Sequence, residues 1–477
     1  MEGNGRGGFL NAQLPKIPLV FLGLGLYRAW IEIVYVGTWV PFPTLPLAGQ
    51  DLFDTAMVLA LFVCALLHRL ITPLFRKRAL LWIAAAAVTG GSLANFAGLA
   101  LPALAPAIAA PSAIVCGIGI AVLILIWSEL YACLSPYQVA VYYAASILTG
   151  AAVILLCRGF IMTYLGVIAA LLPLASMACV LRGFRLVAPA DLPARRAATA
   201  PLPWTPIALM SLYAFAYGLR ESELTAVMGP MSSVGVIAAS SIVLIGITCF
   251  RDRFDLDVMQ RVALPAMVCS LVFVSAYNYV GTFFADICAS LSYTAFSILI
   301  FCILCDLSRR FGFSAVMLFG LERGIRAIFS LLGRLVDNAV LSLGGHSVLS
   351  DLVVAGAIAV LVIAFALVLW HAPTQQARWS VPRIEAAGEE PGSAAEPDTR
   401  VQRLVIACSL LRREYELTPR EEDVLFLLVQ GKSIAEVAQN LVIAKGTAKV
   451  HVRHIYEKLG IHTRDELKAL VAEREVQ

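Results

Sequence analysis

The sequence contains few charged residues. Asp, Glu, Lys and Arg make up 14% of its 477 residues, whereas 60% are hydrophobic, and the mean hydropathy is +0.83. Soluble globular proteins are usually about one quarter charged. This scarcity of charge excludes a purely soluble protein. The net charge of +4 is too small to identify a polyanionic partner by itself.

The placement of the cysteines predicts neither a disulfide framework nor a metal site. The 11 cysteines are scattered, mostly within apolar runs, and Cys302 and Cys305 form an isolated C-x-x-C without a nearby histidine cluster. Structural zinc and redox sites need more ligands or a different context than this. We therefore expect no metal, no cofactor and no catalytic residue.

Long apolar runs occupy most of the chain. A membrane-spanning helix needs about twenty mostly apolar residues. Twelve runs meet this requirement, so residues 1–371 are predicted to be an all-α transmembrane domain. The predicted spans are 17–38, 52–72, 79–99, 107–128, 136–157, 161–181, 206–228, 231–250, 262–281, 283–305, 313–335 and 348–370.

Basic residues follow the even-numbered spans. In bacterial membrane proteins, lysine and arginine concentrate in the cytoplasmic loops. This bias places both termini of a multi-pass protein, surrounded by membrane lipid, in the cytoplasm. The residues concerned are Arg76, Lys77, Arg78, Arg182, Arg185, Arg195, Arg196, Arg251, Arg253, Arg309 and Arg310.

The spans divide six and six around the long connection 182–205, and the first helix of each half carries charge near its middle. This arrangement resembles the major facilitator architecture, in which two six-helix halves enclose a central cavity. Transporters of that superfamily usually have Gly and Asp in a basic motif after the second span. Residues 68–78 keep the basic residues but contain neither Gly nor Asp. The departure favours a sensor, and a working transporter is the alternative.

Several ionisable residues lie inside the predicted spans. Each costs about 2.5–3.5 kcal/mol at mid-bilayer on insertion scales, so such residues need partners or a function. One interpretation is an aromatic-lined pocket in which Arg28 or Arg220 binds an anionic or phenolic ligand. The other is that the charges pair across helices and hold the two halves together. The candidate ligand-binding residues are Tyr27, Arg28, Trp30, Glu32, Tyr213, Tyr217, Arg220, Glu223, Glu322 and Arg326.

A linker is predicted at 372–398, where proline and glycine are frequent and apolar residues are rare. A flexible tether of this length spans roughly 30 Å. Residues 399–413 have apolar residues at helical spacing, including Cys408 and Leu411, which predicts an amphipathic helix packed on the C-terminal domain or, alternatively, on the membrane surface. Ligand binding is expected to change either the pairing of the C-terminal domains between protomers or their docking on the cytoplasmic face. In the second case, the basic loops around Arg76–Arg78 and Arg309–Arg310 would receive the acidic residues Glu421, Glu422 and Asp423.

The region 399–477 is predicted to be a separate domain of short helices. Three capping boxes begin at Thr418, Ser433 and Thr463, and another helix is expected from about 445 to 459. A tight turn between the second and third helices is typical of a helix-turn-helix.

The predicted third helix has two different faces. Ala448, Val452, Ile455 and Leu459 share one side, and positive charge collects on the other. Local basic charge of this kind is suited to phosphate contact, although a solvated face of a protein-interaction bundle would look similar. The candidate DNA-binding residues are Lys445, Thr447, Lys449, Val450, Arg453 and His454.

Four segments carry a specific resemblance. Residues 417–425 (LTPREEDVL), 431–438 (GKSIAEVA), 447–451 (TAKVH) and 458–461 (KLGI) resemble a LuxR-type (NarL/FixJ) helix-turn-helix domain. The resemblance implies a four-helix domain whose third helix enters the major groove and whose fourth helps to form a homodimer on promoter DNA. Gly446 lies in the first turn of the predicted third helix and is unfavourable there, because glycine costs about 1 kcal/mol relative to alanine within a helix.

The whole organisation resembles the membrane-bound LuxR-type regulators of bacteria. It implies a one-component transcriptional regulator that senses a small molecule through its membrane domain and has no catalytic activity. The competing interpretation is a major-facilitator-type transporter with a DNA- or partner-binding tail.

Overall fold

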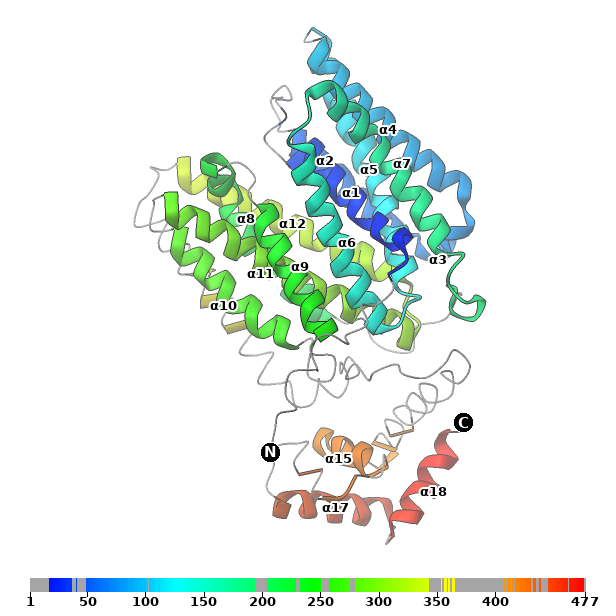
Figure 1. Cartoon of the computed structure of the whole chain (residues 1–477). Coiled ribbons are helices and arrows are strands. Elements are labelled where there is room, and N and C mark those ends of the chain that lie inside the picture. Colours follow the sequence, from blue (N-terminus) through cyan, green and yellow to red (C-terminus); the bar gives the residue numbers. More distant parts are fainter. Residues whose placement is uncertain are drawn as a thin grey trace, which may run out of the picture. The chain divides into compact units, whose positions relative to one another are not determined.

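In the computed structural model of Figure 1, helices are the regular secondary structure of the described residues. Residues described up to Ala364 belong to one compact unit, here called the membrane unit, and those from Ala407 onward belong to a second, the C-terminal unit. The described residues are 17–36, 40, 49–101, 103–193, 202, 204–228, 232–249, 257–274, 279–342, isolated positions between 353 and 364, and 407–475 with short gaps.

The membrane unit begins with a 3-10 turn, η1 (Leu19–Leu22), which leads into α1 (Gly23–Ile31) and a π-helical turn, η2 (Glu32–Val36). The remaining helices are α2 (Gly49–Leu66), α3 (His68–Ile71), η3 (Leu74–Arg76), α4 (Arg78–Ala100), α5 (Ala105–Tyr131), α6 (Pro136–Cys157), α7 (Met162–Gly183), η4 (Pro189–Asp191), α8 (Trp204–Met228), α9 (Ser232–Cys249), α10 (Asp257–Val274), α11 (Tyr279–Phe311) and α12 (Ala315–Ser342).

Each of the first eleven predicted spans coincides with a helix, although the span predicted at 262–281 runs beyond α10, which ends at Val274. Six helical stretches in the described part are long and apolar enough to cross a membrane: Leu19–Val36, Arg78–Ala100, Ala105–Tyr131, Pro136–Cys157, Met162–Gly183 and Phe283–Arg309. The twelfth predicted span, 348–370, lies mostly outside the described residues. The count of twelve therefore stays a prediction.

The helices of the membrane unit form two groups, visible in Figure 1 as the blue-to-teal helices α1–α7 and the green-to-yellow helices α8–α12. Contacts between the groups run mainly through α2 against α12 and α6 against α9. Within the first group, α1 packs closely on α6. A Cβ atom on Gly25 would overlap the backbone carbonyl of Ser146, and one on Gly150 would lie 2.8 Å from the carbonyl oxygen of Gly25. Glycine at both positions lets the two backbones approach.

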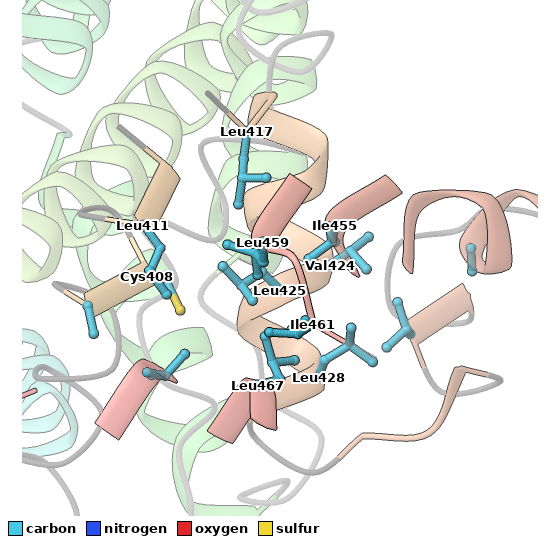
Figure 2. Close-up of a cluster of buried hydrophobic side chains, with 14 of the residues drawn as sticks. Cys408, Leu411, Leu417, Val424, Leu425, Leu428, Ile455, Leu459, Ile461 and Leu467 are labelled. Atoms are coloured by element: carbon cyan, nitrogen blue, oxygen red, sulfur yellow. The ribbon is translucent and has the colours of Figure 1, made fainter. Parts of the chain in front are cut away.

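The C-terminal unit contains α15 (Pro419–Val429), α17 (Lys445–Leu459) and α18 (Arg464–Glu475). Figure 2 shows the apolar side chains that these helices bury together. The helix predicted after Ser433 is described only at Ile434, Val437 and Ala438, so the four-helix count stays a prediction. At the end of α17, Gly460 has φ +67°, a left-handed conformation that glycine adopts without strain and that commonly ends helices.

Residues that precede α15 contribute to the same core. Ala407, Cys408 and Leu411 are buried in one cluster with Leu417 and Leu425 (Figure 2). The remainder of the predicted amphipathic helix and the linker at 372–398 lie outside the described residues. The predicted domain boundaries therefore stay predictions.

Candidate functional sites

The outer face of α17 is the first candidate site. Ala448, Ile455 and Leu459 are buried in the domain core, as the helical phase predicts. On the other side, Thr447 and Lys449 are exposed, Val450 is 42% exposed and the Arg453 side chain is 67% exposed. The helix therefore presents two cations, a hydroxyl and an apolar side chain to solvent. The side chain of Lys445 lies outside the described residues.

His454 follows Val450 by one helical turn but is less exposed than the other described candidate residues of α17. It is half-buried, and its Nδ1 is 3.9 Å from Oε1 of Glu421 on α15. Arg453 is held loosely by an exposed ion pair with Glu457 of 3.6 Å. Such exposed pairs contribute about 0.3–0.5 kcal/mol, so Arg453 remains available for another partner.

Glu421 connects α15 to α17. Its side chain is 5% exposed, and its Oε2 accepts hydrogen bonds of 2.8 Å from both the Thr418 backbone N–H and the Lys458 Nζ. The Thr418 hydroxyl accepts the Glu421 N–H at 3.3 Å, which completes the predicted capping box. The network fixes the position of α17 against α15.

The electrostatics of Glu421 follow from these contacts. Burial alone would raise the pKa of the carboxyl, but the hydrogen bond from Lys458 and those from Thr418 lower the pKa below the ordinary glutamate value. The carboxylate is therefore stabilised in its charged form. Glu422 is also engaged within the unit, through an ion pair of 2.7 Å with Arg412. Two of the three acidic residues expected to dock on the membrane domain thus already have partners beside them.

Arg464 ties the start of α18 to the segment after α15. Its guanidinium donates to the carbonyl oxygens of Leu428 at 2.8 Å and Lys432 at 2.6 Å. These carbonyls lie near the end of α15, where helical oxygens lack intrahelical partners. The predicted capping box at Thr463 is present in part, because its hydroxyl accepts the N–H of Glu466 at 3.2 Å.

The second candidate site is a polar cluster within the membrane unit, formed by helices from both groups. Arg28 of α1 and Arg323 of α12 both donate to the Tyr143 hydroxyl of α6, each at 3.3 Å. Glu322 lies 3.3 Å from Arg323 and 3.5 Å from Arg326. Tyr27, Tyr143 and Glu322 are buried; the other members are Arg28, Arg323, Arg326 and the Phe301 ring. We call these seven residues the arginine cluster.

Four of the ten predicted ligand-binding residues lie in the arginine cluster: Tyr27, Arg28, Glu322 and Arg326. Glu32 is half-buried one turn after Arg28. Trp30 is completely buried elsewhere in the first group, where its Nε1 donates to the Ser92 hydroxyl at 2.7 Å and its ring packs edge-on to Tyr35. This position fits a packing role for Trp30.

Two of the predicted residues of α8 have aromatic partners on α11. The Tyr213 ring stacks on Phe296 with centroids 4.4 Å apart, and its hydroxyl accepts from Ser292 at 3.3 Å. Tyr217 packs on Tyr293 with centroids 4.7 Å apart. The side chains of Arg220 and Glu223 lie outside the described residues.

Sequence reasoning missed Tyr143 and Phe301 and left Arg323 out of the candidate set. Tyr143 lies within an apolar run, 115 residues from Arg28 and 180 residues from Arg323. Nothing in its local pattern distinguishes it from other tyrosines in the spans. A signal was present for Arg323, since it adjoins Glu322 and lies three residues before Arg326.

A further ion pair joins the two groups of helices at one end of α2. Arg334 of α12 contacts Asp54 at 2.6 Å and Asp51 at 3.4 Å. At the other end of the same pair of helices, the Thr72 and Ser314 hydroxyls are 3.1 Å apart. The Arg334 ion pair supports the interpretation that some of the charges in the membrane unit pair across helices and hold the two groups together.

Among the described residues, no group of three or more His, Cys, Asp or Glu side chains is placed to hold a metal ion. Cys302 and Cys305 are both buried on α11. No ligand set for a metal or cofactor emerges from this part of the chain.

Comparison with known protein families identifies the C-terminal unit. Residues 415–471 match the sequence model of the family described as bacterial regulatory proteins, luxR family. This segment is a LuxR-type helix-turn-helix domain, as the motifs predicted. It covers α15, α17 and most of α18.

Curated relatives match the same part of the chain. The transcriptional regulatory protein MctR of Rhizobium johnstonii is 49% identical over 47 residues, which are 10% of this chain and 22% of the relative. The nitrate/nitrite response regulator protein NarL of Escherichia coli is 38% identical over 61 residues, 13% of this chain and 28% of the relative. The chain thus matches less than one third of each relative's length.

Solved structures match a larger share of the chain. The crystal structure of the human organic anion transporter MFSD10 (TETRAN) superposes with a TM-score of 0.50 at 14% sequence identity, over 73% of this chain and 97% of that chain. A Major Facilitator Superfamily transporter, FucP, in the outward conformation has a TM-score of 0.39 at 12% identity. At 14% identity the likeness to MFSD10 concerns the fold alone: the membrane unit has a major-facilitator-like fold.

Proposed function

We propose that this chain, in which a LuxR-type helix-turn-helix domain follows a membrane unit of major-facilitator-like fold, is a one-component transcriptional regulator. A small molecule binds in the membrane unit and changes the occupancy of promoter DNA by the C-terminal unit. The observation that carries the proposal is the presence of both units in one polypeptide, because a DNA-binding domain serves no purpose in transport alone.

The proposed DNA contacts come from α17. Lys449 and Arg453 bind phosphates, and Thr447 and Val450 lie closest to the base edges, where an apolar side chain packs on a thymine methyl group. Lys445 contributes a phosphate contact at the start of the helix. His454 is the weakest member of the predicted set, because it turns toward Glu421. Two copies bind DNA as a homodimer through α18.

The membrane unit lies in the bacterial inner membrane, in contact with lipid, with both termini in the cytoplasm. The support is the placement of basic residues after the even-numbered spans. Arg69, Arg76, Lys77, Arg78, Arg182 and Arg185 are all exposed, as expected for loops at a cytoplasmic surface.

The relatives and solved structures are named as regulators and transporters, and we propose that this chain likewise has no catalytic activity. Transport is the second candidate, favoured by the fold of the membrane unit. Reconstitution into proteoliposomes decides between them. Accumulation of a labelled ligand driven by an ion gradient would establish transport, whereas binding without accumulation supports a receptor.

DNA binding is tested with the full chain in detergent or nanodiscs. In vitro selection from random duplexes supplies an operator, and fluorescence anisotropy then measures affinity at several salt concentrations. Lys449→Ala with Arg453→Ala should weaken binding strongly, and each lost phosphate contact should reduce the salt slope by about one.

A matched control removes two exposed arginines from the membrane unit, Arg69→Ala with Arg185→Ala. It changes net charge by the same amount and should leave both affinity and salt slope unchanged. If the α17 double variant bound the operator as the wild type does at moderate salt, α17 would not be the recognition helix.

A further inference from the structure

Two guanidinium groups converge on one phenolic hydroxyl. Arg28 and Arg323 reach the Tyr143 oxygen from different helix groups, and each N···O distance is 3.3 Å. Hydrogen bonds from a guanidinium to an anionic oxygen are usually about 2.7–2.9 Å long, and neutral N–H···O bonds rarely exceed about 3.2 Å. Both distances are longer than these values, so the completely buried Tyr143 hydroxyl is a weak hydrogen-bond partner for each arginine.

Charged side chains gather around this hydroxyl. Arg28 and Arg323 donate to it, and Glu322, with a side chain 2% exposed, contacts Arg323 and Arg326. Nε of Arg323 lies 3.3 Å from Oε2 of Glu322, and Oε1 of Glu322 lies 3.5 Å from Nη1 of Arg326, which is longer than the usual charge-assisted hydrogen bond of about 2.7–2.9 Å. The charges of the arginine cluster are therefore held loosely, and a carboxylate would offer Arg28 and Arg323 shorter hydrogen bonds.

Flat aromatic surfaces border the same place. The rings of Tyr143 and Phe301 stack with centroids 3.9 Å apart and an interplanar angle of 2°. Phe319 lies 5.0 Å from Phe301, and the Arg323 guanidinium lies 5.8 Å from the Phe301 centroid. The two rings are in stacking contact with each other, so the surroundings of the two guanidinium groups are apolar and aromatic. A carboxylate with an aromatic body suits such surroundings better than a small hydrated inorganic anion.

We propose that the arginine cluster binds an aromatic carboxylate, whose oxygens bridge Arg28 and Arg323 in place of the Tyr143 hydroxyl. This rests on the proposed function in one respect, that the membrane unit receives a ligand. The ligand-free and ligand-bound states then differ in a definite contact: Tyr143 on α6 loses its two donors, and α1 and α12 become joined through the carboxylate. A ligand shifts an equilibrium only through such a difference between states.

The first measurement needs no variant. Purified full-length protein in detergent is heated with benzoate, phenylacetate or 3-phenylpropionate, each compared with its uncharged primary amide, and unfolding is followed by tryptophan fluorescence. At least one carboxylate should raise the unfolding temperature in a dose-dependent way, and its amide should not. Stabilisation by neither member of any pair at 10 mM, or by both members equally, would overturn the proposal.

Variants then locate the site. Arg28→Gln and Arg323→Gln should each weaken binding of the active carboxylate about tenfold or more, the usual effect of losing a charge-assisted hydrogen bond. Tyr143→Phe removes the competing hydroxyl but keeps the ring, so binding should be retained or tightened. Arg334→Gln is the matched control, because Arg334 is also on α12 but pairs with Asp54. Equal affinity in the wild type and both cluster variants would contradict the assignment.

The outcomes separate this inference from the proposed regulation. Carboxylate binding that depends on the cluster but leaves operator affinity unchanged would support the site and contradict ligand control of DNA binding. A response of operator affinity to uncharged aromatic compounds alone would support regulation and overturn the anionic ligand.

Discussion

Removal of the Glu421 carboxylate tests how the recognition helix is held in place. Glu421→Ala deletes the acceptor of two hydrogen bonds of 2.8 Å, one from the Thr418 backbone and one from Lys458. It also removes a negative charge from the first turn of α15. The substitution should therefore destabilise the C-terminal unit and loosen α17, the helix that carries the proposed DNA contacts.

The size of the effect follows from the exposure of each partner. The capping-box bond contributes about 0.5–1 kcal/mol, and the first-turn charge about 0.3–1 kcal/mol. The Lys458 side chain is 37% exposed, so the ion pair is screened and contributes about 0.5–1 kcal/mol. Together these predict a loss of about 1.3–3 kcal/mol, which corresponds to roughly 5–25 °C in a domain of this size.

The assay is urea unfolding of residues 399–477 followed by circular dichroism. Glu421→Gln should lose about half as much as Glu421→Ala, since the amide oxygen accepts one bond without the charge. Lys458→Met should lose only the ion-pair part. A double-mutant cycle between positions 421 and 458 then isolates a coupling of about 0.5–1 kcal/mol.

The pH dependence has a definite sign. The folded-state pKa of Glu421 is lowered, so its contribution is complete above the unfolded value of about 4.3 and is lost as the pH falls through the folded pKa. The stability difference between the wild type and Glu421→Gln should therefore shrink below about pH 4. A loss under 0.5 kcal/mol in Glu421→Ala, or a difference that does not change with pH, would refute the account of this network.

The other predictions concern two glycines and one ion pair. A Cβ on Gly446 would contact nothing within 4 Å, so Gly446→Ala should stabilise α17 by about 0.5 kcal/mol in urea unfolding, and a loss of stability would contradict this. Gly25→Ala should destabilise the membrane unit by about 1–3 kcal/mol or prevent its expression, because the methyl group overlaps the Ser146 carbonyl; thermal unfolding in detergent measures this, and an unchanged midpoint would exclude the close approach of α1 and α6. Arg334→Ala should lower the same midpoint by removing the partner of Asp54, and the exchanged pair Arg334→Asp with Asp54→Arg should partly restore it, whereas no recovery would mean that charge pairing is not the stabilising feature.

The sequence by itself determined the local elements and the identity of the C-terminal unit. Capping boxes, the helix-ending Gly460 and the phase of Ala448, Ile455 and Leu459 predict α15, α17 and their buried faces. These signals are local: a cap acts within one turn, and an amphipathic period identifies the buried side when the other side faces water. The long apolar runs that predicted the membrane helices are also local signals, because each run lies within one helix.

Only the tertiary structure decided which membrane side chains meet. In an apolar environment both faces of a helix are hydrophobic, so the period no longer reveals which side faces the protein interior. Trp30 and Tyr27 are three residues apart on α1, yet Trp30 bonds to Ser92 and Tyr27 joins the arginine cluster. Tyr143 became part of that cluster because the rotation and register of α1, α6 and α12 bring it between two arginines. Rotation and register depend on contacts between distant segments, such as Gly25 against Gly150, which a local pattern does not specify.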